Sequence, residues 1–164
     1  MASSTDRIEK RVLLRAPRER VWRAISDSKQ FGTWFGAEFY GPFAEHATVA
    51  GKLVPTAVDP EVAKLQQPHA GRVLTIRVER VEPMRRFAFR WHPITVEGAV
   101  DLSKVATTLV EFALEDAPEG TMLKITESGF DSLPSERRDA SFKSHEGGWT
   151  HQAGLIEKYL ARTA

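Results

Sequence analysis

The feature that most constrains the fold is an amphipathic segment near the C-terminus, residues 134–160. Mostly apolar side chains recur in it every three or four residues, which places them on one face of a helix with 3.6 residues per turn. These positions are Phe142, His145, Trp149, Ala153, Ile156 and Leu160. A helix over this segment is about 40 Å long at 1.5 Å per residue. So long an apolar face needs a sheet to cover it, and the preceding residues must supply that sheet.

The pattern of the preceding residues predicts strands joined by short turns. Alternation of apolar and polar side chains, clearest in residues 72–81, is typical of a strand with one buried face. The predicted strands span residues 8–14, 38–40, 48–54, 72–81, 87–91, 94–102, 107–114 and 121–128. Two short helices are predicted after the first strand. Pro17 suits the first position of one, and Asp27 with Gln30 forms a capping box that opens the other, which Gly36 ends. The fold class is therefore α+β, with about six to seven of these segments in a curved antiparallel sheet around a long C-terminal helix.

Composition narrows the class of protein. A chain of 164 residues suits a single domain, 1–164, with a core that needs neither a disulfide nor a structural metal. The formal charge of +1 gives no reason to expect nucleic acid or a membrane surface as a partner. Cysteine is absent, the histidines lack metal-ligand spacing, and no phosphate loop or nucleophile elbow occurs, so we expect no metal and no cofactor. Because no signal peptide or membrane span is visible, a cytoplasmic location is the expectation.

Residues 55–70 form an unusually long connection between two predicted strands. Asp59 and Pro60 can start a brief helix that continues through Gln66. Long connections in compact domains are either binding elements or tolerated insertions. The sequence leaves both readings open.

A carboxylate and an imidazole are predicted on two surfaces that pack against each other. The strand 121–128 places Glu127 on the same face as Leu123 and Ile125, and His145 lies in the stripe of the helix that packs on that face. The pair could share a cavity, shift each other's pKa and act as acid and base. Alternatively, Glu127 reaches water or caps a backbone donor near the strand end, and His145 is a satisfied core histidine.

Six aromatic side chains come from the elements that would surround such a cavity, and they either line a ligand site or fill the core. They are Trp34, Phe35, Phe39, Trp91, Phe130 and Trp149. Gln152 adds a polar group three residues after the last of them. Gly147 and Gly148 lie inside the long helix, where each costs roughly 1 kcal/mol relative to alanine. We expect a bulky side chain such as a tryptophan to pack against them, with room for a ligand as the alternative.

Several motifs, in order along nearly the whole chain, resemble one family. They are Ala16-Pro17 with Val21-Trp22, Trp34-Phe35, Gly71-Arg72-Val73-Leu74, Phe87-Ala88-Phe89-Arg90-Trp91, Glu127-Ser128-Gly129-Phe130, and Gly148-Trp149 leading to Tyr159-Leu160. The chain thereby resembles the START-like or Bet v 1-like (SRPBCC) superfamily and, within it, the activator of Hsp90 ATPase homologue domain. The resemblance implies a helix-grip fold, often with an apolar ligand cavity. Full Hsp90 activators look as though they need a further domain ahead of this one, so Hsp90 is a doubtful partner.

Three functions follow as hypotheses. The first is binding of a small apolar or aromatic molecule between the sheet and the C-terminal helix, oriented by Glu127, His145 and Gln152, without an assigned reaction. The second is a cyclase- or hydratase-type enzyme, which related folds support, with Glu127 and His145 as acid and base. The third is an Hsp90-related co-chaperone that acts through its surface, with the basic N-terminal region as the contact. A homodimer through a sheet edge or through Leu13 stays open.

Overall fold

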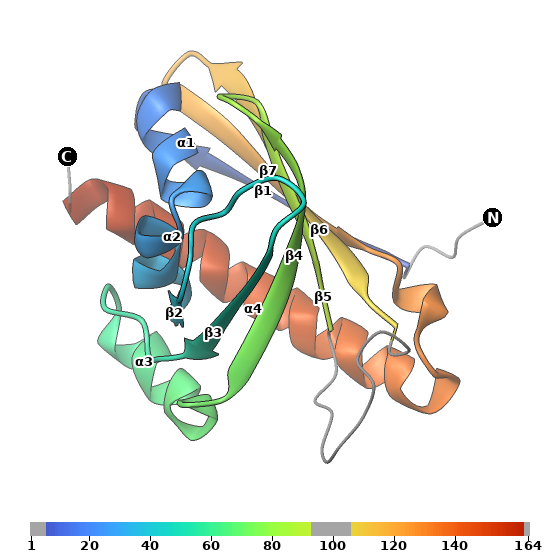
Figure 1. Cartoon of the computed structure of the whole chain (residues 1–164). Helices are drawn as coiled ribbons and strands as arrows, with labels where there is room; N and C mark the ends of the chain where they lie inside the picture. Colours follow the sequence, from blue (N-terminus) through green and yellow to red (C-terminus); the bar gives the residue numbers. More distant parts are fainter. Residues whose placement is uncertain (1–5, 93–105, 163–164) are drawn as a thin grey trace.

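The computed structural model describes residues 6–92 and 106–162 (Figure 1). In chain order the elements are β1 (Arg7–Leu14), α1 (Arg18–Ser26), α2 (Ser28–Phe35), β2 (Ala37–Phe39), β3 (Thr48–Leu53), α3 (Pro60–Gln66), η1 (Gln67–His69), β4 (Val73–Glu82), β5 (Arg86–Trp91), β6 (Thr108–Ala117), β7 (Gly120–Ser128), η3 (Phe130–Ser132) and α4 (Ser135–Arg162). The α+β class, the two short helices after the first strand and the long terminal helix are confirmed. The predicted strand 94–102 lies outside the described residues.

Seven strands form one antiparallel sheet in the order β1-β7-β6-β5-β4-β3-β2. Strands β2 to β6 each pair with the next strand along the chain, which confirms the predicted meander. The first strand then pairs with the last one, so that Ile8 lies opposite Glu127. This pairing places the first and last strands side by side, and β1 and β2 are the two edge strands of the sheet.

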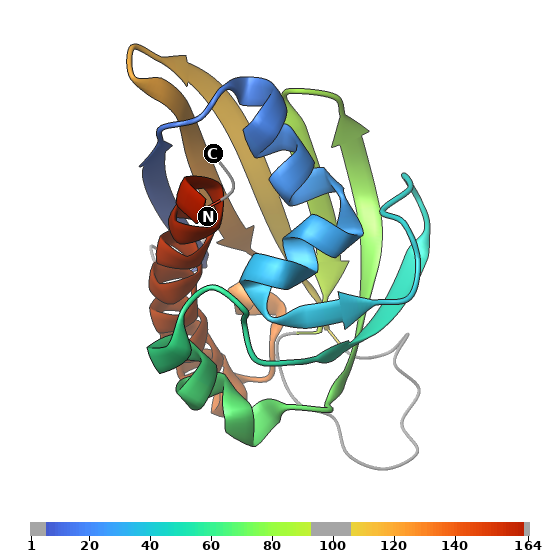
Figure 2. The same cartoon turned by 90° about the vertical axis from the view of Figure 1, so that its left-hand side faces the viewer.

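The longer helices cover one face of the curled sheet. Figure 2 shows α4 running along the open side of the sheet, with α1 and α2 beside it. Contacts join α4 to β1, α1 and α2. Strands contribute alternate residues to the apolar core between the layers, as Phe112 in β6 and Ile125 in β7 illustrate. The predicted stripe of α4 is largely confirmed, because Trp149, Ile156 and Leu160 are buried.

The two short helices after β1 follow the predicted capping chemistry with one difference. Asp27 caps α2 by accepting hydrogen bonds from the backbone of Lys29 and Gln30, and Gly36 ends the helix with a left-handed φ of 98°. Pro17, however, precedes α1 in an extended conformation instead of occupying its first turn. Arg18 is therefore the first helical residue.

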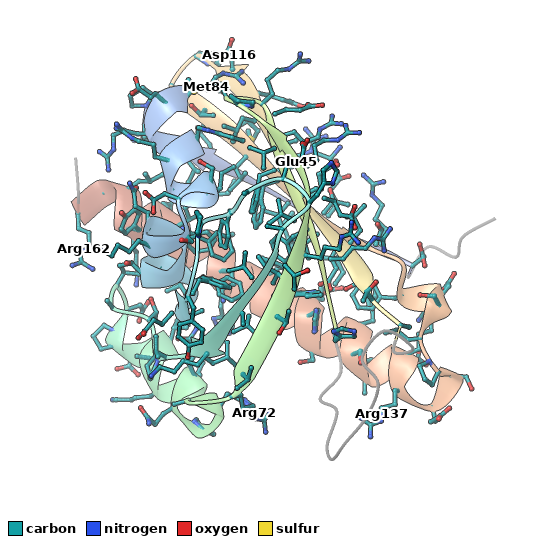
Figure 3. The ribbon with its side chains drawn as sticks, viewed as in Figure 1. Glu45, Arg72, Met84, Asp116, Arg137 and Arg162 are labelled. Carbon is teal, nitrogen blue, oxygen red and sulfur yellow. The ribbon has the colours of Figure 1, made fainter. Side chains whose placement is uncertain are left out.

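Arg18 ties the start of α1 to two hairpins of the sheet. Its guanidinium donates to the backbone oxygen of Met84 at 2.6 Å, between β4 and β5, and to Asp116 Oδ1 at 2.8 Å, near the end of β6. Figure 3 shows Met84 and Asp116 close together at one end of the molecule. This arginine of the basic N-terminal region is thus bound within the fold.

The long connection 55–70 contains the predicted brief helix and is fastened to its surroundings. Asp59 caps α3 through the backbone of Glu61 and Val62, and its other oxygen accepts from Lys158 of α4. Near the end of the chain, Arg162 donates to the backbone oxygen of Ala57 at 3.2 Å. The connection therefore packs against the C-terminal part of α4.

Candidate functional site

The candidate site is built around Glu127 on β7, whose side chain is fully buried. Strand alternation turns it to the same side as Leu123 and Ile125, which are also buried, so the predicted inward orientation is confirmed. Its neighbours across the sheet are Ile8 in β1 and Val110 in β6. A carboxylate in this apolar layer needs hydrogen bonds from its surroundings.

The carboxylate has four polar partners, two for each oxygen. Oε1 lies 2.7 Å from His145 Nδ1 and 2.8 Å from Trp149 Nε1, both on α4. Oε2 accepts from Trp91 Nε1 at 2.9 Å, at the end of β5, and from Thr108 Oγ1 at 2.5 Å, at the start of β6. Three elements from distant parts of the chain therefore meet at one side chain. All of the acceptor sites of an ionised carboxylate are occupied.

The electrostatics of the cluster favour the ionised form of Glu127. Burial by itself would raise the pKa of this carboxyl group, but the hydrogen bond and charge of His145, with hydrogen bonds from Thr108 and Trp91, outweigh it and lower the pKa below the ordinary value of 4.5. An ionised carboxylate can only accept hydrogen bonds, so Nδ1 of His145 must carry the shared proton. Glu127 and His145 are therefore in contact, which is one of the two arrangements that the sequence left open, and the carboxylate is fully buried.

Both tryptophans held by Glu127 belong to a small aromatic group. The indole rings of Trp91 and Trp149 stack with centroids 5.9 Å apart and an interplanar angle of 27°. Phe35 packs at 6.0 Å and 6.2 Å from the two indoles, while the His145 ring meets the edges of Trp91 and Phe130. Trp91 and His145 are only half-buried, whereas Trp149 and Phe130 are buried. The cluster therefore extends from the core towards the surface.

Gln152 joins this group through the end of α2. Its amide Nε2 donates to the backbone oxygen of Phe35 at 3.0 Å, and Gln66 from α3 donates to the same oxygen at 3.2 Å. The other amide atom, Gln152 Oε1, is buried and accepts no hydrogen bond from residues 6–92 or 106–162. It is the one buried side-chain nitrogen or oxygen atom in those residues that has no hydrogen-bond partner.

Two of the predicted lining residues lie elsewhere. Trp34 is fully buried between α1 and the aromatic core, where its Nε1 donates to the backbone oxygen of Ala24 at 2.8 Å. Phe39 packs against Phe31 and Phe43 at 5.9 Å and 5.0 Å. Trp34 is thus part of the core and Phe39 is partly buried against it, and neither side chain contacts Glu127. The structure brings together the other predicted residues: Phe35, Trp91, Glu127, Phe130, His145, Trp149 and Gln152.

The prediction for the two glycines of α4 was wrong. Around a Cβ placed on Gly147 or Gly148, no atom of the described chain lies within 4 Å, the helix backbone and sequence neighbours aside. The glycines face open space, so no tryptophan packs against them. Their helical cost of about 1 kcal/mol is not offset by such a contact.

Thr108 is a site residue that sequence reasoning missed. It is fully buried and pairs across the sheet with Trp91, although the two are far apart in sequence. A threonine at a strand start carries no distinctive pattern, and the pairing register was the information needed to find it. Over the described ranges there is no cluster of three or more potential metal ligands, and no helix has the length and apolarity to span a membrane.

Comparison with solved structures gives the same fold. A protein from Mesorhizobium loti is 21% identical with a TM-score of 0.69, covering 96% of this chain and 98% of that one. The solution structure of the Aha1 dimer from Colwellia psychrerythraea is 15% identical with a TM-score of 0.63, covering 94% and 95%. A protein of the dynemicin biosynthetic locus is 22% identical with a TM-score of 0.67, and the match covers 95% of this chain but only 47% of that one. No curated protein matches the chain.

Family membership rests on a match over most of the chain. The family model described as "Activator of Hsp90 ATPase homolog 1-like protein" matches residues 15–161. This span begins directly after β1, ends in the last turn of α4 and includes every residue of the Glu127 cluster. The chain therefore belongs to the AHSA1 family, the activator of Hsp90 ATPase homologue 1-like proteins.

Proposed function

We propose that this protein binds a small apolar or aromatic molecule at the rim of the Glu127 cluster, between the sheet and α4. The observation that carries the proposal is the buried carboxylate that fixes two indole rings, one of which remains half-buried. Aromatic surfaces of this kind, with a few fixed polar groups, are typical of small-molecule sites.

The cost of the buried charge supports a role beyond packing. A buried ionised group loses its hydration, and apolar side chains of similar volume often give equal or greater stability. Glu127 instead fixes Trp91 and Trp149 by their N–H groups. Rings that are already oriented lose little conformational entropy when a ligand packs on them, which increases affinity.

The position of the half-buried residues supports the same site. His145, Trp149 and Gln152 follow one another at four and three residues along α4 and therefore share one face of the helix. Opposite them lies Trp91 at the end of β5, with a ring centroid 5.7 Å from that of His145. Trp91, His145 and Gln152 are each half-buried and so offer surface to a ligand.

The test is a titration with N-phenyl-1-naphthylamine, an uncharged probe whose fluorescence rises in apolar surroundings. We expect saturable binding with one probe per chain, weakened about tenfold by Trp91→Phe because the ring loses its bond to Glu127 and its fixed orientation. Trp22→Phe is the matched control, since Trp22 is also half-buried but lies on α1. Absence of saturable binding, or equal affinity of the two variants, would refute the proposal.

The geometry gives less support to an acid–base enzyme. Glu127 would have to release one of its four hydrogen-bond donors before it could take a proton from a substrate. A co-chaperone role through the basic N-terminal region also has little support, because several of its arginines are bound to carboxylates of the same chain. Arg11 lies 3.5 Å from Glu9, and Arg18 binds Asp116.

A further inference from the structure

Within residues 6–92 and 106–162, the buried oxygen of Gln152 is the side-chain polar atom without a hydrogen-bond partner. Buried side-chain acceptors in proteins nearly always have a donor, because leaving one without a partner costs the free energy of its desolvation. No donor to this oxygen comes from residues 6–92 or 106–162. A donor from a bound molecule would remove this cost.

The orientation of the Gln152 amide is set by its other end. Nε2 donates to the backbone oxygen of Phe35, and a reversed amide would place two oxygens against each other. Oε1 is therefore held on the side away from that carbonyl. Phe35 carries the ring that packs on Trp91 and Trp149, so the unmatched oxygen belongs to the same part of the fold as the aromatic rim.

Glu127 cannot take the place of Gln152 as the group that binds a ligand donor. Its two oxygens already accept from Trp91, Trp149, Thr108 and His145. An additional donor would have to displace one of these hydrogen bonds. Gln152 Oε1 needs no such exchange.

We infer that Gln152 determines ligand specificity and that the ligand is an uncharged aromatic compound with an N–H or O–H donor, such as an indole or a phenol. This inference rests on the binding function proposed above. An aromatic ether or ketone of the same shape presents an acceptor to Oε1 and leaves both oxygens without a donor. A carboxylate ligand is disfavoured for the same reason and also by the negative charge of Glu127.

The experiment compares indole with benzofuran, in which an oxygen acceptor replaces the N–H group in a ring system of nearly the same shape. Burial alone favours benzofuran, because it is the more apolar molecule. We expect the protein to bind indole about tenfold more tightly, which is the usual size of the penalty for an unmatched buried polar group. Affinities are measured by competition with N-phenyl-1-naphthylamine.

Gln152→Met is the informative variant, because methionine keeps the length of the side chain and removes both polar atoms. The preference for indole should disappear in this variant and persist in the matched control Gln67→Met, at an exposed position. Phe35 keeps its hydrogen bond from Gln66, which helps the variant to fold.

Each result has a distinct meaning. Equal binding of indole and benzofuran by the unmodified protein, or a preference that survives in Gln152→Met, would overturn the inference while leaving the binding proposal intact. Competition by neither compound would also overturn it. If N-phenyl-1-naphthylamine itself does not bind, the proposed function fails, and the inference fails with it. The comparison of the two compounds on the unmodified protein does not depend on any variant.

Discussion

Replacing Glu127 by glutamine tests whether the carboxylate is essential to the cluster, because the substitution keeps the shape and removes one acceptor oxygen. Each carboxylate oxygen binds one indole N–H group, Oε1 that of Trp149 and Oε2 that of Trp91. His145 and Thr108 can adapt, since an imidazole nitrogen or a hydroxyl can also accept a hydrogen bond. An indole N–H can only donate. Whichever way the new amide turns, its NH2 group therefore faces one indole N–H.

The magnitude follows from this count. One buried donor without an acceptor costs about 1–3 kcal/mol, and the remaining hydrogen bonds weaken because they are no longer charge-assisted. Part of this is offset, because a neutral amide is cheaper to bury than a carboxylate. We therefore expect Glu127→Gln to lower the free energy of unfolding by about 2 kcal/mol at pH 7.

Urea unfolding, followed by circular dichroism with tryptophan fluorescence as a second probe, measures this change. The midpoint should fall while the slope m stays constant, as expected when stability changes and compactness does not. Glu111→Gln is the matched control, since this glutamate lies on β6 with a partly exposed side chain and should change stability by less than about 0.5 kcal/mol. A Glu127→Gln variant within about 0.5 kcal/mol of the unmodified protein would refute the argument that the carboxylate holds both indoles.

Three further predictions concern pH, the glycines and the 55–70 connection. The pKa of Glu127 in the folded protein lies below its ordinary 4.5, so the stability that the ionised carboxylate contributes is complete above pH 4.5 and is lost as pH falls through the folded pKa. Urea titrations should therefore show a smaller stability difference between the unmodified protein and Glu127→Gln in that range, and a constant difference would contradict the lowered pKa. Thermal unfolding should show Gly147→Ala stabilised by about 0.5–1 kcal/mol, because Gly147 faces open space. Gly36→Ala should be destabilised by about 1–2 kcal/mol, because Gly36 has a φ of 98° and a Cβ there would lie 2.7 Å from Gln66 Oε1. Stability changes of the same sign in both variants would contradict this reasoning. Lys158→Met removes the ion pair with Asp59, so it should speed hydrogen exchange of the α3 amides and leave exchange of the β6 and β7 amides unchanged. Equal acceleration in all of these elements would contradict the prediction, because it would show that the pair stabilises the whole fold.

The architecture could be predicted because it depends on the period at which apolar side chains recur along the sequence. The spacing of apolar residues identified α4, and alternation placed Glu127 on the inner face of β7. Together these two patterns made a contact between Glu127 and His145 one of two arrangements open to the sequence. The contact at 2.7 Å requires that each residue occupy the inward side of its strand or helix, as both do, and the position of α4 along the sheet decided the outcome.

The other members of the cluster depend on tertiary register, which periodicity does not contain. Thr108 reaches Glu127 because β6 pairs with β5 so that Thr108 lies opposite Trp91. Gln66 reaches Phe35 because the 55–70 connection folds back on the end of α2. Trp34 was a candidate lining residue because its helix was expected to border the cavity. The structure instead places its indole against α1, where Nε1 donates to Ala24, and the packing of α2 on α1 was the information needed to see this.

The choice between phenylalanine and tryptophan in this core gives the strongest reason to treat the Glu127 cluster as more than packing. Phe31, Phe87 and Phe112 fill the core with rings that need no hydrogen-bond partner, and all three are buried. The core tryptophan Trp34 satisfies its N–H group with the backbone oxygen of Ala24 and needs no buried charge. Phenylalanines in place of Trp91 and Trp149 would leave no indole N–H groups to satisfy, and the need for a buried carboxylate would be much reduced. Burying the carboxylate together with the indole N–H groups costs desolvation free energy, which apolar side chains of similar volume would not. What the combination adds is a fixed orientation of both rings, and that orientation matters most for Trp91, which is the indole of the pair that is still partly accessible.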